Sequence, residues 1–207
     1  MKKLVVVLLG LAGPAAAQVG PTTLLDGTAA LGARRGYVAA SAWQLWSPFG
    51  QQRLQAGLGF RATGFFLPGQ SYDAQNGATD ATLHLPAGRH VALNAALHLR
   101  ARVAGPVRVG FNIDLAGLTL GPSLCGQRLQ AGMAERAVAR PVRGKLLLGG
   151  TQDRGTLNSD FYVSVDVAAH YSVHAGFSHV VNAYAVGDQR FQRFANQAAL
   201  GVAYRLR

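Results

Sequence analysis

Apolar and polar residues alternate almost without interruption through residues 89–117, RHVALNAALHLRARVAGPVRVGFNIDLAG. A period of two is the signature of a β-strand, because successive side chains point to opposite faces of the sheet. Two alternating runs separated only by the short segment AGP predict an antiparallel hairpin. The apolar face of this hairpin must be buried in a protein core or must contact lipid.

The same period of two recurs along most of the chain. It is clear in residues 53–66, 159–170, 172–186 and 196–207, and residues 36–47 have the composition of a strand. These runs last 11 to 15 residues, whereas strands of soluble proteins most often have about 5 to 6 residues. A tilted strand that crosses a bilayer needs about 9 to 11 residues. The run lengths therefore favour strands that cross a membrane.

The connections between the runs alternate between short and long. Residues 47–51, 104–106 and 170–172 are short connections, and residues 67–88, 121–156 and 187–194 are long ones. Short periplasmic turns and longer outer loops are typical of outer-membrane barrels. Seven strands would leave the termini on opposite sides, so residues 20–33 are interpreted as an eighth strand, with a short helix or plug as the alternative. The sequence predicts an all-β fold, a closed antiparallel up-and-down transmembrane β-barrel of eight strands.

The first residues, MKKLVVVLLGLAGPAAAQ, have two lysines, a short apolar stretch, a Gly-Pro breaker and small residues. This order is typical of a secretory signal peptide, and the apolar stretch is shorter than the roughly 20 residues of a spanning helix. We therefore expect a cleaved signal peptide at residues 1–17, a single barrel domain at residues 18–207 and location in the outer membrane. The single cysteine, Cys125, cannot form a disulfide within the chain.

The composition of the polar face indicates which face is inside. Beyond the signal peptide, Lys145 and Glu135 are the only lysine and glutamate, although exposed strands of soluble proteins commonly carry such residues. The lumen of an eight-stranded barrel is just wide enough for side chains to fill it. We therefore predict a filled lumen with little or no conductance. Its polar network should contain Arg53, Arg61, Arg100, Arg102, Arg108, Asp114, Asp166 and Arg205. The alternative is a soluble periplasmic, lipocalin-like carrier with its apolar face inward.

The long segment 121–156 is cationic and is expected to contain structure of its own, since unstructured loops of this length are uncommon. Its basic residues are Arg128, Arg136, Arg140, Arg143, Lys145 and Arg154. A basic surface on an exported protein favours an acidic lipid, such as anionic lipopolysaccharide, over nucleic acid. A monomer is the expected oligomeric state.

Over most of its mature length the chain resembles the small outer-membrane β-barrel proteins of Gram-negative bacteria. The segments VRVGFNIDLAG, GTLNSDFYVSV and HAGFSHVVNAY carry the resemblance. Barrels of this group commonly end on an aromatic residue that helps insertion, whereas this chain ends in AYRLR. The resemblance implies a barrel with a structural or surface-interaction role and implies no particular activity.

The segment FSHVVNAYAV is also similar to the His-x-Ser-Asn motif of the lipid A deacylases, which suggests an outer-membrane lipid-modifying hydrolase as an alternative function. The position that matches the nucleophile is Val181, which cannot attack an ester. Ser178 and His179 are neighbours on a strand and should face opposite sides. We therefore predict no catalytic residues. We also predict no metal site, because histidines four apart on a strand are separated by about 13 Å, which is too far to share one zinc ion. No cofactor is expected.

Overall fold

The computed structural model describes residues 20–32, 35–47, 53–75, 80–148 and 153–206. The predicted signal peptide, residues 1–17, lies outside the described residues. In the described part of the chain no helix is long and apolar enough to cross a membrane.

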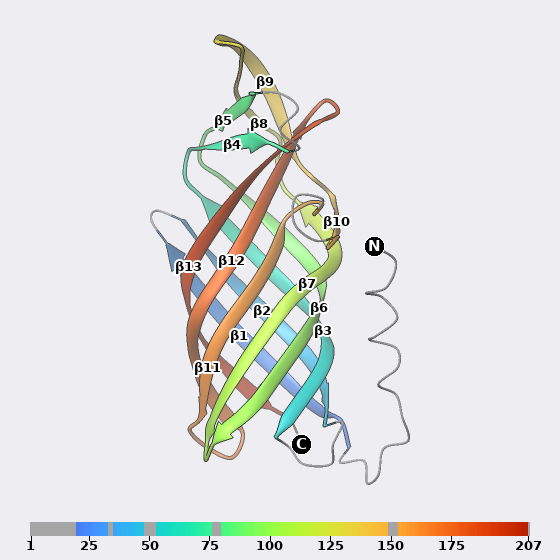
Figure 1. Ribbon diagram of the computed structural model, residues 1–207, viewed down its shortest axis with the longest axis vertical. Helices are drawn as coiled ribbons and strands as arrows, with labels where there is room; N and C mark the ends of the chain where they lie inside the picture. Colours follow the sequence, from blue (N-terminus) through green and yellow to red (C-terminus); the bar gives the residue numbers. More distant parts are fainter. Residues whose placement is uncertain (1–19, 33–34, 48–52, 76–79, 149–152, 207) are drawn as a thin grey trace.

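Long antiparallel strands form a closed ring (Figure 1). They are β1 (Thr22–Gly32), β2 (Arg35–Trp46), β3 (Leu54–Leu67), β6 (Gly88–Ala104), β7 (Val107–Leu120), β11 (Leu157–Asp166), β12 (Tyr171–Val186) and β13 (Gln189–Arg205). Each pairs with the next along the chain, and β13 pairs back with β1. The predictions of an all-β fold, an antiparallel up-and-down order and a closed sheet are confirmed. Residues 20–33, for which a plug was the alternative, contain strand β1.

Over the described residues the sheet has thirteen strands, five more than the sequence predicted. The additional strands are β4 (Gln70–Ala74), β5 (Thr82–Leu85), β8 (Leu124–Gln130), β9 (Met133–Pro141) and β10 (Gly144–Leu146). Four of them, β4, β5, β8 and β9, complete a second and smaller ring with the outer ends of β12 and β13. We call this the upper ring, because it lies above the main ring in Figure 1. The long segment 67–88 thus contains strands β4 and β5, and the long segment 121–156 contains strands β8, β9 and β10.

The predicted long connection at residues 187–194 is wrong. Strands β12 and β13 continue past the main ring and join at a two-residue turn, Gly187-Asp188, so residues 189–194 belong to β13. Gly187 has a φ of 57°, which a glycine adopts without steric cost. The hairpin extends because its outer end pairs with β4 and β9 of the upper ring.

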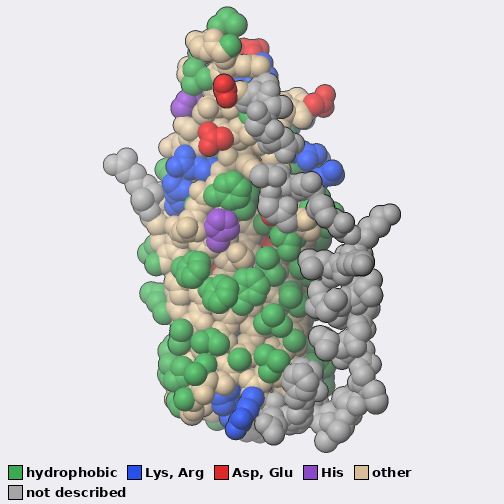
Figure 2. Space-filling model, in the orientation of Figure 1, with side chains coloured by type: hydrophobic (Ala, Val, Ile, Leu, Met, Phe, Trp, Pro, Cys, Tyr) green, Lys and Arg blue, Asp and Glu red, His purple; other side chains and the backbone are tan. Residues whose placement is uncertain are grey.

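A broad apolar belt surrounds the main ring. The outward positions of its strands carry exposed hydrophobic residues, including Phe60 at 76%, Leu200 at 66% and Phe161 at 55%. Figure 2 shows hydrophobic side chains gathered over the middle and lower parts of the molecule, whereas charged side chains lie at its two ends. The exposed apolar face and the buried polar face are therefore reversed relative to a soluble barrel.

The apolar core of the protein lies at the junction of the two rings. Leu83, Phe191 and Tyr184 are among its fully buried members, with neighbours from both the main ring and the upper ring. Tyr72 packs edge-on against Tyr184, with ring centroids 5.1 Å apart. Burial raises the pKa of the Tyr72 phenol to about 12, so it stays neutral near pH 7. Apolar side chains from both rings thus pack together at the junction.

We predict that Phe191→Ala destabilises the upper ring by about 3–5 kcal/mol, because it leaves a cavity at a fully buried site. Amide hydrogen exchange should show faster opening of β4, β5, β8 and β9. Phe194→Ala, three residues further along the same strand and 50% exposed, serves as the control. Equal exchange in the two variants would contradict the assignment of Phe191 to the core.

Candidate functional site

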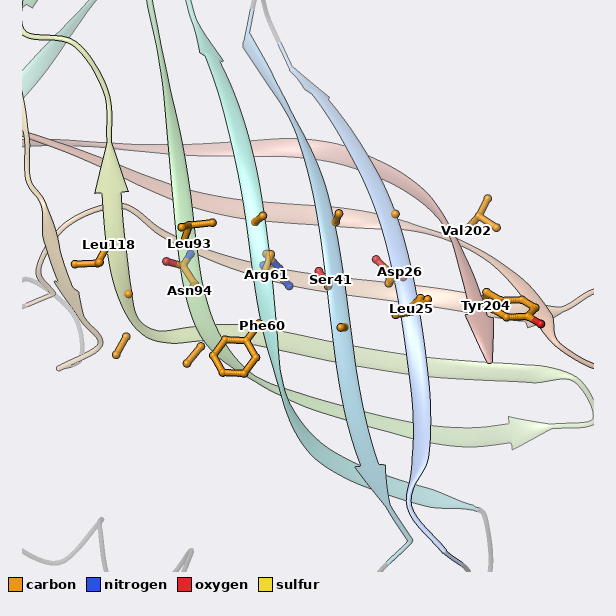
Figure 3. A pocket seen from close by; sticks show the side chains of 17 residues that line it. Leu25, Asp26, Ser41, Phe60, Arg61, Leu93, Asn94, Leu118, Val202 and Tyr204 are labelled. Carbon is orange, nitrogen blue, oxygen red and sulfur yellow. The ribbon is translucent and has the colours of Figure 1, made fainter. Parts of the chain in front are cut away.

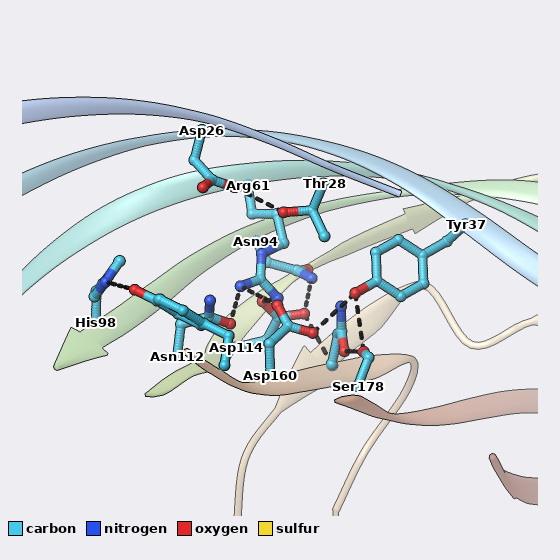
Figure 4. Close-up of polar contacts among 12 residues, drawn as sticks. Asp26, Thr28, Tyr37, Arg61, Asn94, His98, Asn112, Asp114, Asp160 and Ser178 are labelled. Atoms are coloured by element: carbon cyan, nitrogen blue, oxygen red, sulfur yellow. Dashed lines mark hydrogen bonds and ion pairs between the residues drawn. The ribbon is translucent and has the colours of Figure 1, made fainter. Parts of the chain in front are cut away.

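The inward face of the main ring holds a network of buried ions centred on Arg61. The Arg61 guanidinium lies 3.0 Å from an Asp160 carboxylate oxygen and 3.4 Å from an Asp114 oxygen. It also donates a hydrogen bond to the Asn112 side-chain oxygen and lies over the Trp43 ring, 5.6 Å from its centroid. Arg61 is 2% exposed and Asp114 is fully buried. One guanidinium therefore contacts two carboxylates, from β7 and β11 (Figure 4).

Lys145 supplies a second buried cation to this network. The Lys145 ammonium donates to the Asn94 side-chain oxygen at 2.7 Å, and the Asn94 amide donates to Asp114. The backbone N–H of Asn158 also donates to Asp114, at 3.0 Å. Gly117 of β7 pairs with Lys145 of β10 on one side and with Asn94 of β6 on the other. Because Gly117 has no side chain, Lys145 can reach Asn94 across it. Two cations and two carboxylates therefore meet in the lumen.

Hydroxyl groups extend the network toward the apolar core. Tyr37 donates to Asp160 at 2.8 Å, and its oxygen lies 2.9 Å from the Ser178 hydroxyl. Ser178 donates to the side-chain oxygen of Asn158 at 2.6 Å. These contacts join β2, β11 and β12 across the ring. The hydroxyl groups of Tyr37 and Ser178 therefore both form hydrogen bonds to buried polar groups.

A second ionic cluster lies nearer the chain termini. The Arg108 guanidinium donates to Asp166 at 2.9 Å and 3.1 Å, and Arg205 lies 3.6 Å from the other oxygen of Asp166. Arg100 donates to the side-chain oxygen of Gln55 at 2.6 Å. Polar and charged side chains thus line both halves of the main ring.

Of the eight residues expected in the lumen, six lie inside the ring. Arg61, Arg100, Arg108 and Asp114 are buried, and Asp166 and Arg205 are partly exposed. Arg53 and Arg102 are exposed, so the structure does not place them among the buried members of the network. They lie together where β3 begins and β6 ends, with the Arg102 N–H donating to the Arg53 carbonyl at 2.6 Å. At this end of the ring the side chains of Arg53 and Arg102 are in contact with solvent.

The cationic segment also requires one correction. Arg136, Arg140, Arg143 and Arg154 are exposed, and Arg128 is partly exposed and pairs with Glu135 at 2.6 Å. Lys145, predicted on the outer surface, is 5% exposed and points into the lumen. The sequence showed no alternation long enough to place it, since β10 has only three residues and pairs with a distant strand.

Several lumen residues were missed by the sequence reasoning, among them Asp160, Asp26 and Tyr37. Asp160 shares the strand face of the predicted Asp166, so its position in the alternation could have identified it. Asp26 lies on β1 and approaches His174 Nδ1 at 3.5 Å, but the strand itself was weakly marked. Tyr37 gave no signal, because the two faces of residues 36–47 are not separable in the sequence.

The geometry does not assemble a hydrolase site from Ser178 and His179. Ser178 is fully buried and hydrogen-bonded within the lumen. His179 lies on the outward face, where its Nδ1 is 2.7 Å from the Asn196 side-chain oxygen and its ring stacks on Phe194. The wall of the barrel therefore separates the two side chains. Among the described residues no group of three potential metal ligands is assembled.

Comparison with known proteins gives similarities only among solved structures. No family model and no curated protein sequence matches the chain. Neisserial surface protein A is 13% identical, with 92% of this chain and 100% of that chain covered and a TM-score of 0.43. The attachment invasion locus protein of Yersinia pestis is 11% identical, with 90% and 99% covered and a TM-score of 0.40. The N-terminal β-barrel domain of OprF from Pseudomonas aeruginosa is 11% identical, with 89% and 97% covered and a TM-score of 0.35.

We predict that Arg61→Met destabilises the folded protein by about 3–5 kcal/mol, because it leaves Asp114 and Asp160 buried without their shared cation. Urea unfolding of the protein in detergent micelles measures the loss. Arg128→Met, which breaks only the exposed pair with Glu135, should cost less than about 1 kcal/mol. Equal losses in the two variants would show that the buried network does not stabilise the ring.

Proposed function

We propose that this protein is a non-enzymatic outer-membrane barrel with a structural or surface-interaction role, and that its eight ring strands span the bilayer. The observation that carries the proposal is the reversal of the two faces. Leucine, valine and phenylalanine point outward, whereas Arg61, Asp114 and Asp160 are buried inside. Such a surface is costly in water and is matched by lipid hydrocarbon.

The height of the apolar belt supports this proposal. On β7 the outward hydrophobic residues extend from Val109 to Leu118, and Leu120 follows at the end of the strand. Ten residues at about 3.3 Å each, on strands tilted by about 40°, rise roughly 25 Å, which is the height of a membrane barrel's apolar band. Closure of the ring also leaves no unpaired strand edge toward lipid.

The orientation follows from the connections. The turn between β6 and β7 is two residues long, and both described chain ends lie on the same side as this turn (Figure 1). We assign this side to the periplasm and the upper ring to the outside, as in other barrels with short periplasmic turns. The exposed Arg136, Arg140, Arg143 and Arg154 then belong to the outer part of the protein, where anionic lipopolysaccharide is the expected counter-charge.

The fold also supports a role other than transport through the lumen. The ion pairs inside the main ring and the apolar cluster at its junction with the upper ring support a closed lumen. We predict little or no conductance in planar lipid bilayers after insertion of the folded protein. A stable current of the size given by open porins would contradict the proposed closed lumen.

Membrane location is tested by a charge placed on the belt. Leu200→Arg, at an outward position that is 66% exposed, should cost about 2–4 kcal/mol of unfolding free energy in phospholipid vesicles, because it moves a charge into hydrocarbon. Val138→Arg, 55% exposed on the upper ring, should change it by less than about 1 kcal/mol. Recovery of the unmodified protein from the soluble periplasm without detergent would end the membrane proposal.

A further inference from the structure

The outward surface of β1, β2 and β3 contains a shallow apolar groove. Part of its lining is a row of small residues on neighbouring strands, in which Gly27 pairs with Ala40 and Ala40 with Ala62. The same row continues through Leu93 on β6 to Leu118 on β7. Together with the side chains around it, the row lines a hollow of about 970 Å³ (Figure 3).

This groove runs from the middle of the apolar belt to its outer edge. Gly27 is the middle residue of β1, whereas Leu118 lies two residues before the outer end of β7. Four strand spacings of about 4.8 Å give the groove a length of about 19 Å. One leaflet of the hydrocarbon core is about 15 Å deep, so an inclined acyl chain of one leaflet fits this path.

Two basic hollows adjoin the outer end of the groove. One, of about 580 Å³, is lined by Leu118, Ser123, Arg140 and Arg143, and the other, of about 290 Å³, is lined by Arg89. They share Leu120 and Gly121 and therefore lie on either side of the end of β7. Of the described residues that line these hollows, none carries a carboxylate.

The three arginines are available for an external anion. Arg89, Arg140 and Arg143 are exposed, and none of them forms an ion pair with another described residue. Arginine binds phosphate through several parallel N–H donors, and it does so more strongly where water is partly excluded. The cations lie directly beyond the apolar belt, at the level where lipid headgroups begin.

We propose that this surface is a binding site for one phosphorylated, multiply acylated lipid of the outer leaflet. Its phosphates contact Arg89, Arg140 and Arg143, and one of its acyl chains lies in the groove over Gly27, Ala40 and Ala62. This proposal rests on the proposed membrane location. It adds one specific position on the barrel surface at which a lipid binds. Charge complementarity selects an anionic headgroup, and the apolar lining of the groove selects an acyl chain.

The site is tested by native mass spectrometry of the folded full-length protein in detergent, titrated with diphosphoryl lipid A and, separately, with phosphatidylcholine. We expect lipid A to bind more tightly than phosphatidylcholine. The triple variant R89Q/R140Q/R143Q should weaken lipid A binding on the order of tenfold or more. The control variant R53Q/R102Q/R136Q removes the same charge from exposed arginines outside the hollows and should bind within about twofold of the unmodified protein.

The groove is tested separately by filling it. A40F/A62F should weaken lipid A binding several-fold, whereas A175F/A198F, the same change at exposed positions on β12 and β13, should not. Inorganic pyrophosphate should compete poorly, because it lacks the acyl chain.

Three results would overturn the site: equal loss in the two arginine triples, no difference between the two phenylalanine pairs, or full competition by pyrophosphate. Insertion into vesicles is measured in parallel. A protein that fails to insert contradicts the membrane proposal, whereas normal insertion with unchanged lipid A affinity in R89Q/R140Q/R143Q contradicts the lipid site alone.

Discussion

The structure depends on pairing the charges that its strands turn inward. An unpaired guanidinium inside a protein costs several kcal/mol, and the narrow ring leaves little space for water to compensate. Arg61 meets this constraint by contacting Asp114 on β7 and Asp160 on β11, and Lys145 adds a cation through Asn94. These contacts fix strands that are distant in sequence around one centre. Because successive side chains of a strand point to opposite faces, the apolar side chains that alternate with these charges point outward.

Ionic and apolar contacts lie in different parts of the structure. Ion pairs lie inside the main ring, whereas Leu83, Tyr184 and Phe191 pack at its junction with the upper ring. The hairpin of β12 and β13 belongs to both rings, so the upper ring is tied to the barrel through backbone hydrogen bonds. The outer surface can therefore hold exposed cations at a fixed height above the apolar belt.

Much of the main ring could be predicted because its determinants are local. Alternation at 53–66 and 89–117 specifies strands and faces, and the scarcity of lysine and glutamate indicates that the polar face is enclosed. The same alternation assigned Arg61, Arg100, Arg108 and Asp114 to the polar face, and these four residues are buried. Alternation gives the face of a residue but not its distance from the end of the barrel, and Arg53 and Arg102 are exposed where β3 begins and β6 ends.

The sequence by itself determined the long strands, their order along the chain and which side chains share a face, since each follows from the two-residue period of an extended backbone. Only the tertiary structure decided the upper ring, the inward position of Lys145 and the meeting of Arg61 with two carboxylates. Short strands such as β4, β5 and β10 carry too few residues to reveal a period, and they are specified by pairing with distant segments. The register between neighbouring strands likewise decides that small residues on β1, β2 and β3 align into one groove, because only cross-strand pairing brings them side by side.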